Sequence, residues 1–236
     1  TRIFSFNLGR DTIDLGATAL VTPQNSPSLT ASETVEIQIK NFGIDTPSVF
    51  NVGYIFENGT PVIDTINFEL APDSTYNHIF MPTVDLSVVG EYEFRVFTDL
   101  ADDQAPFNDT LFARVSKLPR KDVGVIAING LNGTICNDTI DVEITFSNFG
   151  TEAVTEVTIN VELNDVALSP IQYSGPTIAP GETGSFNLQL IGLVNGTNVI
   201  VATTSNPDGE ADEIADNDTF TRDFTATPEG VSVFLE

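Results

Sequence analysis

The sequence predicts an all-β fold made of two tandem antiparallel β-sandwiches, each with about seven strands. Three observations carry this prediction. A set of short motifs recurs once along the 236 residues, and several segments alternate apolar and polar side chains. In addition, no stretch of about ten residues spaces its apolar side chains at the helical period of 3.6.

The internal repeat sets the number of domains. Four motifs recur in the same order with a spacing of about 108 residues, which is strong evidence for two homologous modules. The matching pairs are residues 13–16 and 121–124, 41–43 and 148–150, 72–74 and 180–182, and 108–110 and 217–219. We therefore expect a first module over residues 11–117 and a second over residues 118–228. Residues 1–10 are expected to be the tail of a preceding module, and residues 229–236 the start of a following segment.

The alternating segments predict strands with one buried face and one face in water. Residues 34–40 and 91–96 alternate in the first module, and residues 142–146, 157–163 and 186–190 do so in the second. Turn-forming Gly, Pro, Asn and Asp residues lie between these segments. Such alternation is typical of antiparallel sheets, and short, regularly spaced strands favour an immunoglobulin-like sandwich. The absence of Trp and of any disulfide partner for Cys136 sets the modules apart from antibody domains.

The charge of the chain is strongly negative. It has 34 acidic residues against 9 Lys and Arg, a net charge of −25. Such a surface repels phosphate, so nucleic acid and anionic membranes are not expected partners. Apolar segments are also shorter than the roughly 20 residues that span a bilayer. Two interpretations of the acidic excess stay open: solubility, and binding of Ca²⁺ by some of the carboxylates.

The sequence offers few groups for catalysis, and we expect no enzyme. The single histidine, His78, is predicted to share a strand face with Tyr76 and Phe80 as a half-exposed residue rather than a general base. Cys136 is expected to be a small apolar filler. The aromatic residues expected in the core are Phe42, Phe94, Phe149 and Phe186.

Two acidic stretches are the candidate metal sites. Residues 206–218 place carboxylates at alternate positions, as in the first half of an EF-hand loop, but lack its glycine and its final Glu. Residues 99–109 are the shorter counterpart in the first module. A solvated acidic hairpin loop is the alternative interpretation. The candidate Ca²⁺ ligands are Asp208, Glu210, Asp212, Asp216 and Asp218, together with Asp99, Asp102, Asp103 and Asp109.

Topology places these stretches at the end of the sandwich where each module begins, because they join the last two predicted strands. The acidic stretch of the second module should therefore face the basic segment 116–121, and that of the first should face Arg10. We expect opposite charges to form an ion network at each junction and to stiffen it. Exposed pairs contribute only about 0–1 kcal/mol each, so several pairs or a bound ion would have to act together.

The motifs resemble the CARDB family, a bacterial immunoglobulin-like module associated with cell adhesion. The resemblance rests on residues 122–125, 142–150, 178–182 and 217–219, and on their counterparts 13–16, 37–43, 70–74 and 108–110. The first module departs from the pattern where Asp73 replaces the Gly of a Pro-Gly turn. The resemblance covers almost the whole chain and implies the fold. It implies no activity, because the family shares no catalytic residues.

The chain also resembles large surface proteins of Bacteroidota, in which Asp-Ser or Asp-Thr followed by an apolar or small residue is an O-glycosylation motif. This resemblance implies a secreted, extracellular or cell-surface protein. Hydrogen bonding of Asp and Thr at turns and strand edges is the alternative explanation of the motif. The candidate glycosylation sites are Thr12, Thr65, Ser74, Thr110 and Thr139.

Together these observations favour non-catalytic stalk or spacer modules of a secreted, adhesin-like protein, whose partners are the neighbouring modules of the same chain. Accessory domains of a secreted hydrolase are one alternative, and direct binding of surface glycans or proteins is another. No cofactor is expected apart from Ca²⁺. Residues near predicted edge strands that oppose sheet-to-sheet pairing, such as Lys40, Pro61 and Pro170, favour a monomer.

Overall fold

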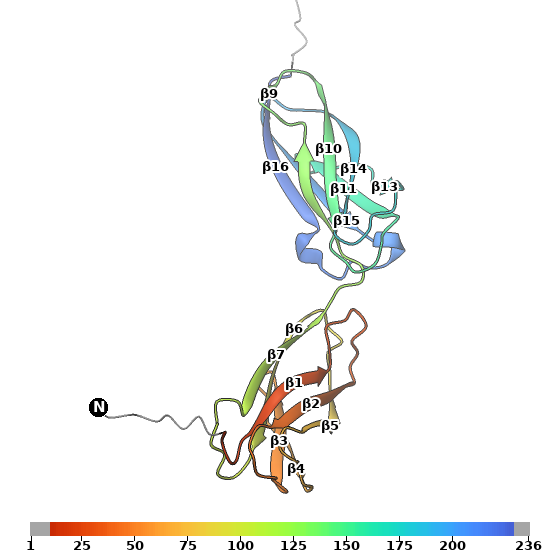
Figure 1. Ribbon diagram of the computed structural model, residues 1–236. Coiled ribbons are helices and arrows are strands. Elements are labelled where there is room, and N and C mark those ends of the chain that lie inside the picture. The colour runs from red at the N-terminus through yellow and green to blue at the C-terminus, as the bar shows by residue number, and fades with distance from the viewer. Residues whose placement is uncertain (1–9, 229–236) are drawn as a thin grey trace, which may run out of the picture. The chain divides into compact units, whose positions relative to one another are not determined.

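The computed structural model describes residues 10–228 (Figure 1). The expectations for residues 1–9 and 229–236 lie outside this described part of the chain. The chain divides into two compact units, the first ending at Leu118 and the second beginning at Pro119. Residues 10–118 are called module one below, and residues 119–228 are called module two.

Module one has two antiparallel sheets packed face to face. One sheet has the strand order β1-β2-β5 and the other the order β4-β3-β6-β7. The strands are β1 (Leu15–Thr22), β2 (Glu33–Asn41), β3 (Phe50–Phe56), β4 (Val62–Ile66), β5 (Thr75–Val84), β6 (Gly90–Asp99) and β7 (Thr110–Lys117).

Module two repeats this plan with nine strands in place of seven. Its sheets have the orders β14-β10-β8 and β12-β11-β15-β16-β9, and β13 also pairs with β11. The strands are β8 (Val123–Asn129), β9 (Thr134–Ile135), β10 (Thr139–Asn148), β11 (Val157–Leu163), β12 (Val166–Ala167), β13 (Ile171–Tyr173), β14 (Thr183–Ile191), β15 (Gly196–Ser205) and β16 (Thr219–Ala226). The counterpart of β4 is divided into β12 and β13, and β9 is an addition.

Both modules tie the segment after their first strand to their last strand. In module one, Ser26 forms a parallel bridge with Lys117, at the end of β7. In module two, the short strand β9 pairs in parallel with β16. The chain thus changes from one sheet to the other, which joins the two sheets along one edge of the sandwich.

The predicted alternation places the core of each module. In β2, Val35, Ile37 and Ile39 are buried, and the residues between them face outward. In β10 the same holds for Ile144 and Phe146. Burying one such side chain stabilises a fold by about 1.5–3 kcal/mol. Each module has its own hydrophobic core, and the predicted all-β fold class is confirmed.

The Asp73 that departs from the Pro-Gly pattern occupies the same backbone conformation as its glycine counterpart. Asp73 has φ 63° and Gly181 has φ 80°, both in the left-handed region. Their N–H groups donate to equivalent carbonyls, those of Asn41 and Asn148, at 3.0 and 2.8 Å. Asp tolerates this region better than most residues, so the turn is preserved despite the substitution.

One expectation about the core is wrong. Phe149 is 48% exposed, whereas Asn148 beside it is fully buried. Adjacent strand residues point to opposite faces, and the polar Asn occupies the inner position because it bonds the loops described below. Phe42 is half-buried under Lys40, whose Nζ lies 5.0 Å from the ring centroid. Among the described residues, no helix has the length and apolar character needed to cross a membrane.

Candidate functional site

The two acidic stretches lie where topology places them. The stretch 99–109 begins at the last residue of β6 and leads to β7. Residues 206–218 connect β15 to β16 through the single 3₁₀ turns η1 (Pro207–Gly209) and η2 (Ala215–Asn217). In each module this loop bonds the segment that leads into the first strand. The N–H of Gln104 donates to the carbonyl of Ile13, and the N–H of Glu213 donates to the carbonyl of Lys121, both at 2.9 Å.

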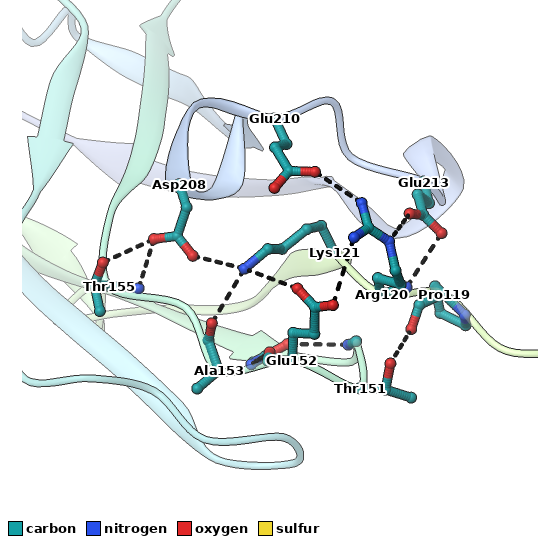
Figure 2. Close-up of polar contacts among 12 residues, drawn as sticks. Pro119, Arg120, Lys121, Thr151, Glu152, Ala153, Thr155, Asp208, Glu210 and Glu213 are labelled. Carbon is teal, nitrogen blue, oxygen red and sulfur yellow. Dashed lines mark hydrogen bonds and ion pairs between the residues drawn. The ribbon is translucent and has the colours of Figure 1, made fainter. Parts of the chain in front are cut away.

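Lys121 is the most buried cation of the loop cluster in module two. Its side chain is 7% exposed, and its Nζ donates to Asp208 Oδ2 at 2.7 Å and to the Ala153 carbonyl at 3.2 Å. Glu152 Oε2 lies 3.5 Å from the same nitrogen (Figure 2). Burial alone would lower the pKa of Lys121, but these acceptors outweigh it and raise the pKa.

Asp208 anchors this lysine to a second loop. Its Oδ1 accepts hydrogen bonds from the N–H and Oγ1 of Thr155, both at 2.8 Å (Figure 2). It also accepts the N–H of Glu156 at 2.9 Å. Burial raises the pKa of Asp208, but the hydrogen bonds from Lys121, Thr155 and Glu156 outweigh that effect and hold the pKa well below its usual range. The carboxylate is therefore firmly charged and joins three segments of module two.

Arg120 extends the cluster at the surface. Its guanidinium lies 2.9 Å from Glu210, 3.5 Å from Glu152 and 3.7 Å from Glu213, and its side chain is 42% exposed. Its backbone N–H also donates to Glu213 Oε2 at 3.1 Å. We call this group the Lys121 network. Its members are Arg120, Lys121, Glu152, Asp208, Glu210 and Glu213 (Figure 2).

The ion network expected in module two is therefore present, but the one expected in module one is not. Arg10 does not pair with the acidic stretch 99–109. It forms a bidentate pair with Asp73 at 2.6 and 2.7 Å and donates to the Phe42 carbonyl. The prediction placed Arg10 beside the last loop from topology alone, whereas the left-handed turn at Asp73 presents a nearer carboxylate.

A buried asparagine holds the same end of each module together. Asn148 donates through Nδ2 to the carbonyls of Glu152 and Ile178, and its Oδ1 accepts from the N–H of Gly150. Asn41 makes the equivalent bonds in module one, to Asp45, Leu70 and Gly43. All six distances lie between 2.8 and 3.0 Å.

Beside each asparagine lies a group of three aspartates. In module two, Asp212 accepts the N–H groups of Val123 and Ile214 through its two oxygens, at 2.8 and 2.9 Å. Asp122 accepts Asn217 Nδ2 at 2.8 Å. In module one, Asp103 accepts two backbone N–H groups and Asp14 accepts Asn108 Nδ2 in the same way. The carboxylate clusters are Asp14, Asp103 and Asp109 with Asn108, and Asp122, Asp212 and Asp218 with Asn217.

The last aspartate of each cluster is poorly stabilised as an anion. Burial, together with the charges of Asp212 and Asp122, raises the pKa of Asp218 to about 7. Burial and the neighbouring carboxylates likewise raise the pKa of Asp109 to about 6.

The candidate Ca²⁺ ligands separate into three groups in the structure. Asp208 and Glu210 pair with cations of the Lys121 network. Asp99, Asp102 and Asp216 are exposed. The remaining candidates, Asp103, Asp109, Asp212 and Asp218, belong to the carboxylate clusters. Within residues 10–228, no three His, Cys, Asp or Glu side chains are arranged to hold a metal ion.

Sequence reasoning missed four residues of these clusters. Asp14 and Asp122 precede the first strand of each module, and Asn108 and Asn217 precede the last strand. The signal was available, because all four lie in the recurring motifs 13–16, 121–124, 108–110 and 217–219. Those motifs indicate two modules, and the contacts between their residues become visible only in the fold.

The remaining candidates lie apart from these clusters. Thr12, Thr65, Thr110 and Thr139 are exposed, and Ser74 is half-buried, so glycosylation of these residues stays a prediction. His78 is half-buried on β5, with its Nε2 2.7 Å from Asp64 Oδ2 on β4. Cys136 is exposed rather than a buried filler, so that expectation is wrong.

No protein-family model matches the chain, and no curated protein matches it. Among solved structures, the crystal structure of a CARDB domain from Pyrococcus furiosus, described as a complex with di-metal ions, is 19% identical with a TM-score of 0.39. That match covers 47% of this chain and 96% of the other. An NMR structure of the CARDB domain is 18% identical with a TM-score of 0.38, over 46% and 97% of the two chains. Fibronectin(III)-like modules of Clostridium thermocellum CbhA are 14% identical with a TM-score of 0.31, over 89% and 94%. At such identities the likeness concerns the fold alone.

Proposed function

We propose that this chain forms non-catalytic spacer modules of a secreted, cell-surface protein of the adhesin type, with tandem CARDB-like modules as found in Bacteroidota. The observation that supports this most is the Lys121 network. It fixes the residues that lead into module two to the loops of that module through one buried ammonium and several backbone hydrogen bonds. A segment held in this way is stiffer than a Gly/Ser-rich linker, which suits a module that must hold a position.

The two modules share a loop frame, meaning the backbone contacts between the last loop and the segment before the first strand, and this similarity supports the same function. Gln104 of module one occupies the place of Glu213, and each residue bonds the backbone that precedes the first strand. Repeated units of this kind lengthen a chain without redesign, because each unit contacts mainly its neighbours. The net charge of −25 disfavours association of the modules with one another. The expected partners are therefore neighbouring modules, and the expected state is a monomer.

Distance measurements between the modules test the spacer function. Spin labels would be attached at Thr65→Cys and Val166→Cys, two exposed strand positions, in a Cys136→Ser background. We expect a narrow distance distribution that broadens in the Arg120→Ala variant and at high salt, because the guanidinium pairs are screened there. A broad distribution that neither change affects would contradict the proposal.

Surface location needs a separate experiment. An antibody raised against this chain should stain intact cells of the source organism, and brief protease treatment of those cells should remove the staining. The mass of the native protein should fall on chemical deglycosylation if the exposed Asp-Thr sites carry sugars. If the parent protein instead released a catalytic domain on limited proteolysis, accessory modules of a hydrolase would replace the spacer function.

One observation favours glycan binding as a second candidate. Phe112 on β7 is 76% exposed and lines a groove of about 270 Å³ together with Ile55, Glu93 and Arg95. Exposed aromatic rings beside polar groups can stack on sugars, although no Trp is present. A screen against immobilised polysaccharides should detect binding that Phe112→Ala abolishes. Phe107→Ala is the matched control, since Phe107 is 86% exposed and does not line this groove. Equal binding by both variants would remove this candidate.

A further inference from the structure

The carboxylate clusters contain all the unpartnered buried side-chain oxygens found within residues 10–228. These atoms are Oδ1 of Asn108, Asp109, Asn217 and Asp218. Buried polar atoms in folded proteins almost always have a partner, so each exception needs an explanation. Here the exceptions occur as the same Asn-Asp pair in each of two modules, at matching positions. A chance defect of one loop would not repeat in this way.

Negative charges surround these oxygens, although in module one Arg10 is also close enough to Asp14 to interact with it. Asp122 is 4% exposed and Asp218 is 9% exposed, and the third carboxylate, Asp212, lies close enough to affect both. In module one, Asp14 is 8% exposed and lies near Asp109. Two neighbouring carboxylates removed from water repel each other, and burying them is unfavourable without a counter-charge.

Within the described residues, none of these aspartates forms a salt bridge with Lys or Arg. Arg120 and Lys121 are near in sequence but are directed to Glu210 and Asp208. Backbone N–H groups stabilise Asp212, whereas Asp122 receives one amide and Asp218 Oδ1 receives nothing.

We propose that each module binds one calcium ion at its carboxylate cluster, through Asp14 and Asp109 in module one and through Asp122 and Asp218 in module two. The proposal does not depend on the spacer function. It differs from the sequence expectation, because Asp14 and Asp122 join Asp109 and Asp218 as ligands and the other seven candidates are left out. Asp103 and Asp212 position the loops instead, since both oxygens of each are bonded to backbone N–H groups.

Calcium fits the chemistry of these residues. The available donors are carboxylate, amide and backbone oxygens, which hard divalent cations prefer, and the clusters contain no sulfur or imidazole ligand. With two carboxylates available for the ion, amide, carbonyl or water oxygens must complete its coordination. Such a site should be weak. We expect a Kd on the order of 10⁻⁴–10⁻³ M, the range of extracellular calcium modules.

Equilibrium dialysis of the whole chain against CaCl₂ at about pH 7.5 and physiological ionic strength tests the proposal directly. We expect saturable binding of about one ion per module within that affinity range. Asp109→Asn and Asp218→Asn should each remove one equivalent, and the double variant should bind none. The matched control is Asp102→Asn with Asp216→Asn. It removes two charges from the same loops at exposed positions and should retain both equivalents.

A thermal scan provides the second measurement. Calcium at about 10 mM should raise the Tm of the wild-type chain by roughly 5–10 °C through binding to the folded state. NaCl at matched ionic strength should not. The absence of saturable binding by the wild-type chain would overturn the proposal. Equal losses in the exposed control would also overturn it, since diffuse attraction to the acidic surface would then explain the binding. Circular dichroism verifies that the Asn variants fold, and Asp14→Asn and Asp122→Asn replace any that do not.

Discussion

The two modules hold their incoming chains with the same backbone contacts but with different side chains. Ile13 of module one and Lys121 of module two are matching positions of the internal repeat. Each carbonyl accepts an N–H from the last loop, donated by Gln104 in one module and Glu213 in the other. Only module two adds a buried ion pair to this frame. Matching positions can therefore preserve the backbone pattern while the side chains change from apolar to charged.

The difference follows from the length and content of the last loops. The loop between β15 and β16 is longer than the one between β6 and β7, and the longer loop contributes Asp208, which reaches Lys121 and Thr155. In module one, Arg10 binds the exposed Asp73 instead. A partly buried pair with satisfied hydrogen bonds is sensitive to the loss of one partner, whereas an exposed pair is screened by solvent.

The largest difference between the two modules should appear when the acid of the buried pair is removed. Asp208→Ala leaves the Lys121 ammonium, which is 7% exposed, without its nearest counter-charge. It also removes the acceptor of the Thr155 and Glu156 N–H groups. We expect a loss of about 3 kcal/mol in the free energy of unfolding of module two, and little change in module one. Differential scanning calorimetry of the whole chain measures both.

The control for this change is Asp216→Ala, which removes an exposed acid from the same loop. It should change stability by no more than about 0.5 kcal/mol. A similar loss in both variants would show that the loop responds to net charge rather than to the Lys121 contact.

The two asparagines should behave alike where the ion pairs differ. Asn41→Ala and Asn148→Ala each remove three hydrogen bonds from a buried site. Asn41→Ala leaves the carbonyls of Asp45 and Leu70 unpaired. Asn148→Ala leaves that of Glu152 unpaired, while the Ile178 carbonyl keeps the N–H of Val154. We expect a loss of about 2–3 kcal/mol in each module. The measurement is the calorimetric transition of each module. If one variant lost much more than the other, the shared loop frame would not be energetically equivalent in the two modules.

These residues show how far sequence reasoning extends in this protein. The strands and the core were predictable because apolar side chains alternate along β2, β6, β10 and β11. The position of the acidic loops also followed from strand order. The repeat motifs include Asn41 and Asn148, but only the fold shows that these side chains hydrogen-bond the neighbouring loops.

Side-chain partners were not predictable because they depend on the positions of loops to within a few ångströms. The expected pairing of Arg10 with the last loop is wrong, since the Asp73 turn is nearer. The alternate acids 208, 210 and 212 suggested one calcium loop, but a lysine, an arginine and two backbone N–H groups bind them separately. Phe149 was expected inside, but the buried position belongs to Asn148.

The two carboxylate clusters should make the stability of their modules depend on pH to different extents. In the unfolded chain the pKa of Asp218 is about 3.9, and in the folded chain burial and its neighbours raise it to about 7. The folded state therefore binds more protons between these values, and stability falls as pH rises through them. With calcium removed by a chelator, Asp218→Asn should stabilise module two by about 1–2 kcal/mol at pH of about 8, after allowance for solvent screening.

The gain should disappear below about pH 3, where the wild-type carboxyl is neutral in both states. Asp109→Asn should give a smaller gain in module one, because the pKa of Asp109 is raised only to about 6. The Tm of each module across this pH range measures both effects. A gain that stays constant with pH would mean that the carboxyl charge is not its cause.

The smallest effect should come from Arg120, whose loss tests whether the surface half of the Lys121 network adds stability or only local order. Its side chain is 42% exposed and touches three acids, so Arg120→Ala should cost about 0.5–1 kcal/mol at low salt and less at about 0.5 M NaCl. The backbone N–H of Arg120 remains bonded to Glu213 only while that acid stays in place. Hydrogen exchange at this amide should therefore accelerate by more than the global loss of stability explains. Unchanged exchange would mean that the guanidinium does not help to fix the incoming chain, and that Lys121 and the backbone contacts are sufficient.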